Sequence, residues 1–177
     1  MARASWTVCI AAATAVWLTG LAVQAQTAAT QRYSASVVAV QDGDSMTVMH
    51  GEKKEKIILY GIDCPERGQE FGAEARKFTD DLCYRKDITV DVRGRDKYGR
   101  TIAEVYLQNG TDLNQELVKR GLAWWSDKFA PKEQALKQLQ DTAKASHTGL
   151  WAAPNPIPPW IFRNGQRSVQ AEIKTGK

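Results

Sequence analysis

The stretch VVAVQDGDSMTVMHGEKKEKIILYGI, residues 37–62, decides the fold. Val37 to Val40 is rich in residues that favour strands, and Asp42-Gly43-Asp44 then supplies a turn before Ser45 to His50, where residues alternate between two faces. A second turn leads to Lys56 to Ile62, whose alternate residues also share a face. The alternation and the two short turns predict three strands in a meander.

The rest of the chain adds two more strands and three helices. Pro65 ends the meander because proline cannot donate to a strand ladder. Apolar spacings and turn residues then predict, in order, a helix from about Gly72, strands at Ile88–Val92 and Thr101–Leu107, a helix capped by Asp112, and a helix opened by Pro131 and ended by Gly149. This order predicts a mainly β member of the α+β class, a five-stranded antiparallel barrel with three helices packed against it.

Composition supports one globular domain. The chain has 177 residues, of which 43% are hydrophobic and 25% charged, and it contains no internal repeat. Its formal net charge is +4, with cations grouped at 53–56, 93–100, 119–128 and 163–177. Such groups are either solvated faces or contacts for a polyanion, so charge alone does not decide between them.

The N-terminal 25 residues have the pattern of a secretory signal. A basic start at Arg3 precedes an apolar run from Val8 to Val23, and Val23-Gln24-Ala25 resembles a cleavage site with small residues. An uncleaved N-terminal anchor is the alternative. With cleavage, the mature protein is secreted or periplasmic, is free of the membrane and is expected to be a monomer.

The predicted organisation is a signal peptide (1–25), a flexible segment (26–34), a barrel domain (35–153) and a Pro-rich arm with a disordered basic tail (154–177). Four prolines in residues 154–159 favour an extended arm. The mature chain retains two cysteines, Cys64 and Cys83. In an oxidising compartment they either pair or remain two small buried thiols.

Two groups of residues could carry chemistry. Four acidic residues at strand ends or turns offer hard oxygen ligands for Ca²⁺ or Mg²⁺, although solvated turn acids are the alternative: Asp42, Asp44, Asp63 and Glu66. The chain has two histidines and no Cys/His cluster, which excludes a zinc site of ordinary spacing.

The second group surrounds one turn. Lys97 and Arg100 could bind phosphate and Tyr98 could stack on a base, although a plain hairpin with soluble flanks is the alternative. Carboxylates for a cation together with an arginine for phosphate are what phosphodiester hydrolysis requires.

Three motifs occur in a distinctive order: Asp42-Gly43-Asp44, then Gly61-Ile62-Asp63-Cys64-Pro65-Glu66, then Asp96-Lys97-Tyr98-Gly99-Arg100. Their order and spacing resemble the staphylococcal nuclease (thermonuclease) family. The likeness also takes in residues 114–123 and 149–151, so it covers about residues 35–163. It implies an OB-fold barrel, secreted in many bacteria, that cleaves DNA and RNA with Ca²⁺.

The resemblance also implies roles for matching positions. Asp44, Asp63 and the backbone carbonyl of Cys64 correspond to calcium ligands. Glu66 corresponds to the residue that activates or orients the attacking water, and Arg100 to an arginine that stabilises the developing charge. Lys97 and Tyr98 correspond to residues that line the nucleotide pocket.

The chain departs from the family at Ile58. A second catalytic arginine of the family lies five residues before the calcium aspartate of its Asp-x-Pro-Glu segment, where this chain has Ile58. Lys56 is two residues earlier on the same strand face and could reach the same phosphate oxygen, but an ammonium group lacks the guanidinium fork. Trp124, Trp125 and Phe129 stand where family members tend to have tyrosines.

These observations favour an exported, calcium-dependent nuclease that acts on DNA or RNA with little sequence specificity, with activity reduced by the loss of the arginine at position 58. The alternative is a catalytically weakened module that binds single-stranded nucleic acid or another polyanion.

Overall fold

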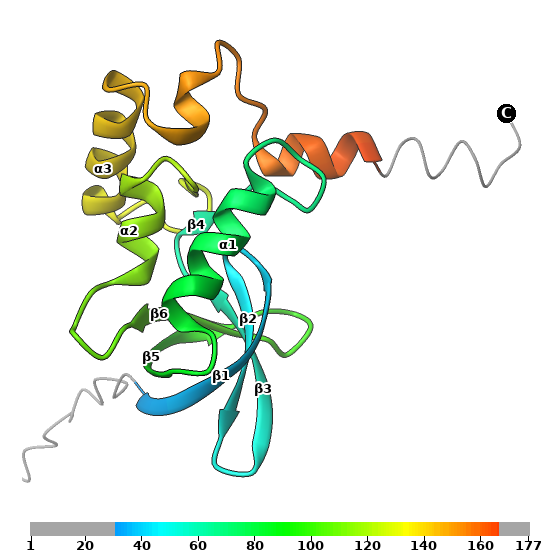
Figure 1. Cartoon of the computed structure of the whole chain (residues 1–177), viewed down its shortest axis with the longest axis vertical. Helices are drawn as coiled ribbons and strands as arrows, with labels where there is room; N and C mark the ends of the chain where they lie inside the picture. Colours follow the sequence, from blue (N-terminus) through cyan, green and yellow to red (C-terminus); the bar gives the residue numbers. More distant parts are fainter. Residues whose placement is uncertain (1–30, 167–177) are drawn as a thin grey trace, which may run out of the picture.

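Five strands close into a barrel in the computed structural model, which describes residues 31–166 (Figure 1). Around the barrel the order is β1-β2-β3-β6-β5, and β5 pairs back onto β1. The bounds are β1 Arg32–Asp42, β2 Ser45–His50, β3 Lys53–Leu59, β5 Asp87–Arg95 and β6 Thr101–Tyr106. The predicted mainly β barrel fold is confirmed.

One pairing in the barrel is parallel, whereas the sequence predicts an antiparallel barrel. Ile57 of β3 pairs with Thr101 of β6, and Leu59 pairs with Ala103 in the same direction. The chain passes through a helix and β5 between these two strands, so it has returned to the starting end of β3 when β6 begins. The other four pairings of the barrel are antiparallel.

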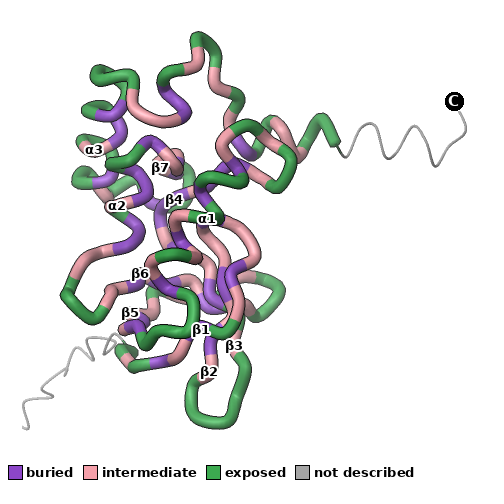
Figure 2. Tube along the Cα trace, viewed as in Figure 1, coloured by how far each residue is buried: buried purple, intermediate pink, exposed green. Residues whose placement is uncertain are grey.

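The barrel interior is filled by the apolar residues that alternate along its strands. Met46, Val48 and Ile57 are completely buried, and Leu59 nearly so. Ile58, between two buried neighbours, is only half-buried because its side chain points to the outer face. Figure 2 shows this burial concentrated in the barrel and beneath the helices, while the β2–β3 turn is exposed.

The helices α1 Gly72–Cys83 and α2 Leu113–Lys119 pack against the barrel. Helix α3 Gln134–Ala145 packs on α2, and the short 3₁₀ helix η1 Gly149–Ala152 packs on α3. Asp112 caps α2 as predicted, because its carboxylate accepts a hydrogen bond from the Gln115 amide at 3.1 Å. The last predicted helix begins at Gln134, three residues after Pro131, since residues 131 and 132 form a turn and Glu133 is the N-cap.

A two-stranded sheet beside the barrel holds the region between β3 and α1. β4 (Ile62–Asp63) pairs antiparallel with β7 (Trp124–Trp125), so that Asp63 lies opposite Trp124. The sequence does not predict β7. Within residues 31–166 no helix is long and apolar enough to span a bilayer.

The ends of the described region differ from the predicted boundaries. β1 begins at Arg32, inside the segment predicted to be flexible, because Arg32 and Tyr33 pair with Asp91 and Val90 of β5. At the other end, residues 156–158 have no regular secondary structure, and residues 159–166, within the predicted arm and tail, form a helix. This helix begins at Pro159, and a proline in the first turn of a helix leaves no hydrogen bond unmade. The predicted signal peptide and residues 167–177 of the basic tail lie outside the described residues.

Candidate active site

The Asp42-Gly43-Asp44 turn connects β1 to β2 and packs tightly against its surroundings. A Cβ atom on Gly43 would lie 2.7 Å from Cys64 Sγ and 2.8 Å from Ala75 Cβ, distances too short for any side chain. Thr79 of α1 donates a hydrogen bond from its hydroxyl to the Gly43 carbonyl at 2.6 Å. The turn therefore needs glycine, and α1 holds it in place.

Asp44 is tied to the segment that carries the other acidic residues. The backbone amide of Cys64 donates to Asp44 Oδ2 at 2.9 Å, and the Leu59 amide donates to the Asp44 carbonyl at 2.9 Å. The turn after β1 and the strand β4 are thus brought together, although they are 20 residues apart in the chain. The Asp42-Gly43-Asp44 and Gly61–Glu66 motifs therefore lie side by side at one end of the barrel.

Glu66 lies on a loop that is ordered by its own backbone. The Glu66 amide donates to Gln69 Oε1 at 3.0 Å, and the Gln69 amide returns a bond to the Glu66 carbonyl at 2.9 Å. Gly72, the first residue of α1, lies against the same carbonyl, so closely that a Cβ there would overlap it. The backbone of Glu66 is therefore held against the start of α1.

Burial and neighbouring charges raise the pKa of Asp44 to about 7. Burial of the carboxylate is the largest cause, followed by repulsion from Asp63, with smaller repulsion from Glu66 and Asp42. The hydrogen bond from Cys64 opposes this rise. The charges of Asp63, Glu66 and Asp42 therefore all act on Asp44 at this end of the barrel.

An arginine that the sequence does not single out binds two of these carboxylates. The Arg163 guanidinium, on helix 159–166, donates to Asp63 Oδ1 at 3.0 Å and to Asp63 Oδ2 at 2.6 Å. The same guanidinium bonds Glu66 Oε1. These bonds, with those to Asp63 the largest cause, raise the pKa of Arg163 further above its usual value.

Arg100, Lys97 and Tyr98 gather at the β5–β6 turn. Lys97 Nζ lies 5.0 Å and Arg100 Cζ 5.6 Å from the centre of the Tyr98 ring, which is 73% exposed. Arg100 Nε donates to Asp96 Oδ2 at 2.6 Å. Among the described residues, no hydrogen bond or ion pair joins Arg100 to Asp44, Asp63 or Glu66.

Lys56 and Ile58 lie on the outer face of β3. Lys56 is exposed and pairs across the strands with Thr47, whereas Ile58 pairs with Ser45, the residue after Asp44. Position 58 is thus adjacent to the acidic turn along the barrel, and Lys56 is one strand repeat farther away. The shared face expected from the sequence agrees with the observed register.

Cys64 and Cys83 are both buried and unpaired in the described structure. Burial raises the pKa of both thiols, to about 12 for Cys83. The Cys64 side chain packs against Gly43, and the Cys64 backbone amide donates to Asp44.

The chemistry of the donor set suits a hard divalent cation. The negative charge of Asp63 repels that of Asp44, and among the described residues Asp44 has no cationic partner. Within residues 31–166 no group of three or more His, Cys, Asp and Glu side chains converges tightly enough to hold a metal ion by itself. A cation here would therefore take two carboxylates, a backbone carbonyl and water.

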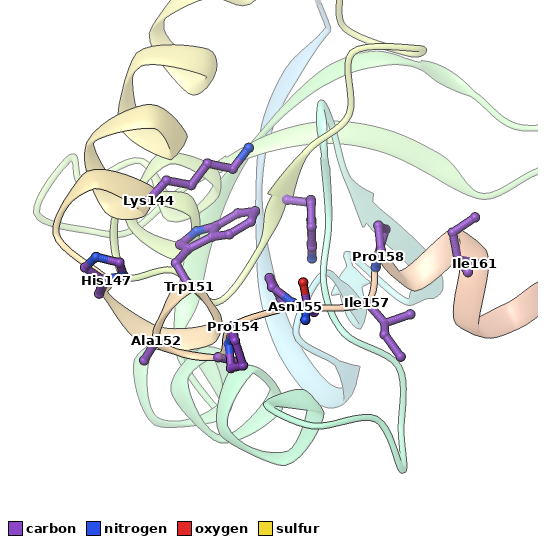
Figure 3. A pocket seen from close by; sticks show the side chains of 12 residues that line it. Lys144, His147, Trp151, Ala152, Pro154, Asn155, Ile157, Pro158 and Ile161 are labelled. Atoms are coloured by element: carbon purple, nitrogen blue, oxygen red, sulfur yellow. The ribbon is translucent and has the colours of Figure 1, made fainter.

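An aromatic groove lies beside the C-terminal arm. It has a volume of about 780 Å³ and is lined by Trp124, Lys144, Trp151 and the arm that runs from Pro154 to Pro158 (Figure 3). Lys144 Nζ lies 4.6 Å from the Trp151 ring centre. The lining includes no acidic residue, so the groove is separate from the carboxylates.

Comparison with known proteins gives a consistent result. The family model described as "Staphylococcal nuclease homologue" matches residues 56–153. The chain is 37% identical over 138 residues to an uncharacterized endonuclease of Haemophilus influenzae, covering 77% of this chain and 76% of the relative. It is 38% identical to an uncharacterized endonuclease of Escherichia coli O157:H7, over 72% of this chain and 83% of the relative. It is also 32% identical to a micrococcal nuclease of Shigella flexneri, over 77% of this chain and 84% of the relative. The matched region of the family model ends before Arg163.

Proposed function

The chain belongs to the staphylococcal nuclease family, and on that premise we propose that it is an exported, calcium-dependent nuclease that cleaves DNA or RNA with little sequence preference. The observation that carries the proposal is the approach of Asp44, Asp63 and Glu66 at one end of the barrel. Nucleases of this family are generally metal-dependent, and carboxylate oxygens are the donors that Ca²⁺ prefers.

The cation would be held by Asp44, Asp63 and the carbonyl of Cys64. A bound divalent cation polarises phosphoryl oxygens and neutralises part of their charge. Glu66, whose backbone amide bonds Gln69, would accept a proton from the attacking water. Hydrolysis also needs further positive charge on the phosphoryl oxygens, where negative charge develops.

The β5–β6 turn would supply substrate contacts. Arg100 would exchange its ion pair with Asp96 for a phosphate, and this exchange costs little because the Arg100 side chain is 41% exposed. The exposed ring of Tyr98 would stack on a base, with Lys97 beside it and Lys56 on the neighbouring strand as further cations. Stacking and phosphate contacts read no base edges, which supports low sequence specificity.

The alternative is a binding module with weak hydrolysis. It is favoured by Ile58, which offers no guanidinium, and by the ion pairs that engage Asp63 and Glu66. The two functions differ in whether the phosphodiester bond breaks.

The discriminating experiment incubates the purified protein with end-labelled single-stranded DNA and RNA in calcium, in magnesium and in chelator. The proposal expects shortened products that require calcium. Retention of full-length strands in every cation, with a stable protein–DNA complex, would support the binding module instead.

Export and oligomeric state have their own tests. The proposal of export expects protein recovered outside the cytoplasm to have the mass of a chain that begins at residue 26, and recovery of the full-length mass would contradict it. We also propose that the mature protein is a monomer, which its hydrodynamic mass in solution measures.

A further inference from the structure

We propose that Arg163 is a catalytic residue of this site, and that its guanidinium binds the scissile phosphate in place of the arginine that position 58 lacks. This inference rests on the proposed nuclease function, and it assigns a role to a residue outside the region matched by the family model.

Arg163 lies beside two of the carboxylates that the proposed mechanism places around the phosphate. Its three bonds reach Asp63, a proposed cation ligand, and Glu66, the proposed base. Among the described residues it is the one arginine with a hydrogen bond to either carboxylate. A phosphate bound between the cation and the base is therefore within reach of this side chain without rearrangement of the barrel.

The guanidinium keeps donors free for a phosphate. An arginine has five N–H groups, and these bonds use both hydrogens of one terminal nitrogen and one of the other. No hydrogen bond among residues 31–166 is recorded from Nε or from the remaining hydrogen of the second terminal nitrogen. The Arg163 side chain is 36% exposed, so solvent and substrate can approach these donors.

The arm that carries Arg163 is held by contacts that do not involve the guanidinium. Gln69 Nε2, on the Glu66 loop, donates to the Ile157 carbonyl at 2.5 Å. The Trp160 ring packs edge-on against Trp124 with 5.6 Å between ring centres, and Trp124 lies opposite Asp63 in the β4–β7 sheet. The arm is thus attached to the Glu66 loop and its helix to the β4–β7 sheet, and both of these segments carry the carboxylates that Arg163 binds or adjoin them.

Helix 159–166 brings the Trp160 ring and the Arg163 guanidinium to the same side of the helix. Trp160 and Arg163 are three residues apart, a spacing that puts them on adjacent positions of one helix face. Figure 1 shows helix 159–166 beside the loop that leads into α1. Figure 3 shows Pro154, Asn155, Ile157 and Pro158 along the path from Trp151 to that helix.

The ion pairs with Asp63 and Glu66 also imply competition with the cation. A guanidinium on Asp63 opposes binding of a second positive group to the same carboxylate, and a bound cation releases the guanidinium toward a phosphate. An arrangement in which Arg163 only blocks the site makes the same prediction for cation affinity. The two roles differ at saturating calcium. A phosphate-binding Arg163 then supports nucleotide binding and cleavage, whereas a blocking Arg163 supports neither.

The test compares the parent protein with Arg163→Ala, Arg163→Lys and the double variant Ile58→Arg/Arg163→Ala. Arg120→Ala is the matched control, because Arg120 is an exposed arginine that also faces a carboxylate, that of Glu116 at 3.9 Å, on α2. Thermal unfolding checks that each variant retains the fold. The Tm should change little, because Arg163 is not part of the barrel core.

Three measurements follow. Calorimetric titration with calcium alone should show tighter binding to Arg163→Ala, by at least about threefold, because a competing cation is gone. Titration with thymidine monophosphate in saturating calcium should show at least about fivefold weaker binding to Arg163→Ala and no change in Arg120→Ala. The cleavage rate at saturating calcium and DNA should fall at least about tenfold in Arg163→Ala, recover only partly in Arg163→Lys and recover in the double variant.

The outcomes separate the possibilities. An unchanged or faster cleavage rate in Arg163→Ala, with unchanged nucleotide binding, would overturn the proposal and leave Arg163 as a blocking group. If the parent protein cleaves neither DNA nor RNA, the proposed nuclease function fails, and nucleotide binding still decides whether Arg163 contacts phosphate.

Discussion

Replacement of Gly43 by alanine should both destabilise the protein and disable the site. The added Cβ would meet Cys64 Sγ at 2.7 Å and Ala75 Cβ at 2.8 Å, whereas such atoms normally stay about 3.5–4.0 Å apart. The turn and α1 must therefore separate by roughly 1 Å, while the Thr79 bond to the Gly43 carbonyl opposes that movement. Overpacking of this kind costs about 1–3 kcal/mol.

The assay is thermal unfolding in chelator, followed by calcium titration. For a domain of this size the cost corresponds to a fall in Tm of about 3–10 °C. Calcium binding should weaken as well, because displacement of the turn moves Asp44 away from the Cys64 amide. In the Gly43→Ala background, Cys64→Ala removes the nearest atom and should recover part of the loss.

Gly94→Ala is the matched control. Gly94 lies in β5 without a positive φ, and a Cβ there meets nothing within 4 Å. This change should leave stability unaltered or raise it by up to about 1 kcal/mol. If Gly43→Ala and Gly94→Ala unfold at the same temperature, the close packing of the turn against Cys64 and α1 is wrong.

Three further substitutions test separate parts of the site. Asp44→Ala should abolish calcium-dependent cleavage with the fold intact, and cleavage by this variant in chelator at the parent rate would contradict the cation assignment. Arg100→Lys keeps the charge but loses the fork, so turnover should fall at least about tenfold, and an equal rate would mean that Arg100 remains on Asp96 during the reaction. Trp160→Ala removes the ring contact with Trp124, which is worth about 0.5–1.5 kcal/mol, and should weaken thymidine monophosphate binding severalfold while Tm changes little. Unaltered nucleotide binding would show that the arm is held without this ring.

Much of the barrel and part of the site are predictable from local sequence. Strand β2 has the predicted bounds, because strict alternation and two short turns leave few registers for it. Asp112 caps a helix through its own side chain, which is again a local property. The approach of Asp44 to β4 follows from the meander, since the turn after β1 and the end of β3 lie at the same end of a barrel.

Contacts between distant segments are not predictable in this way. Arg163 lies 100 residues from Asp63, and its position depends on the docking of the arm through Gln69 and Trp124. A helix of about two turns has too few residues to show an apolar period, and the prolines before it indicate an extended chain. The direction of Arg100 is a similar case, because the turn fixes its place while the pairing with Asp96 fixes its side chain.

The most direct test of the account is the fate of end-labelled single-stranded DNA mixed with the purified protein, with cleavage and binding measured in the same samples. In calcium the account predicts progressive shortening of the strand by the parent protein, and intact DNA when chelator is present. DNA that stays full length in calcium while bound to the protein would contradict the claim that the carboxylates of Asp44, Asp63 and Glu66 form a hydrolytic site.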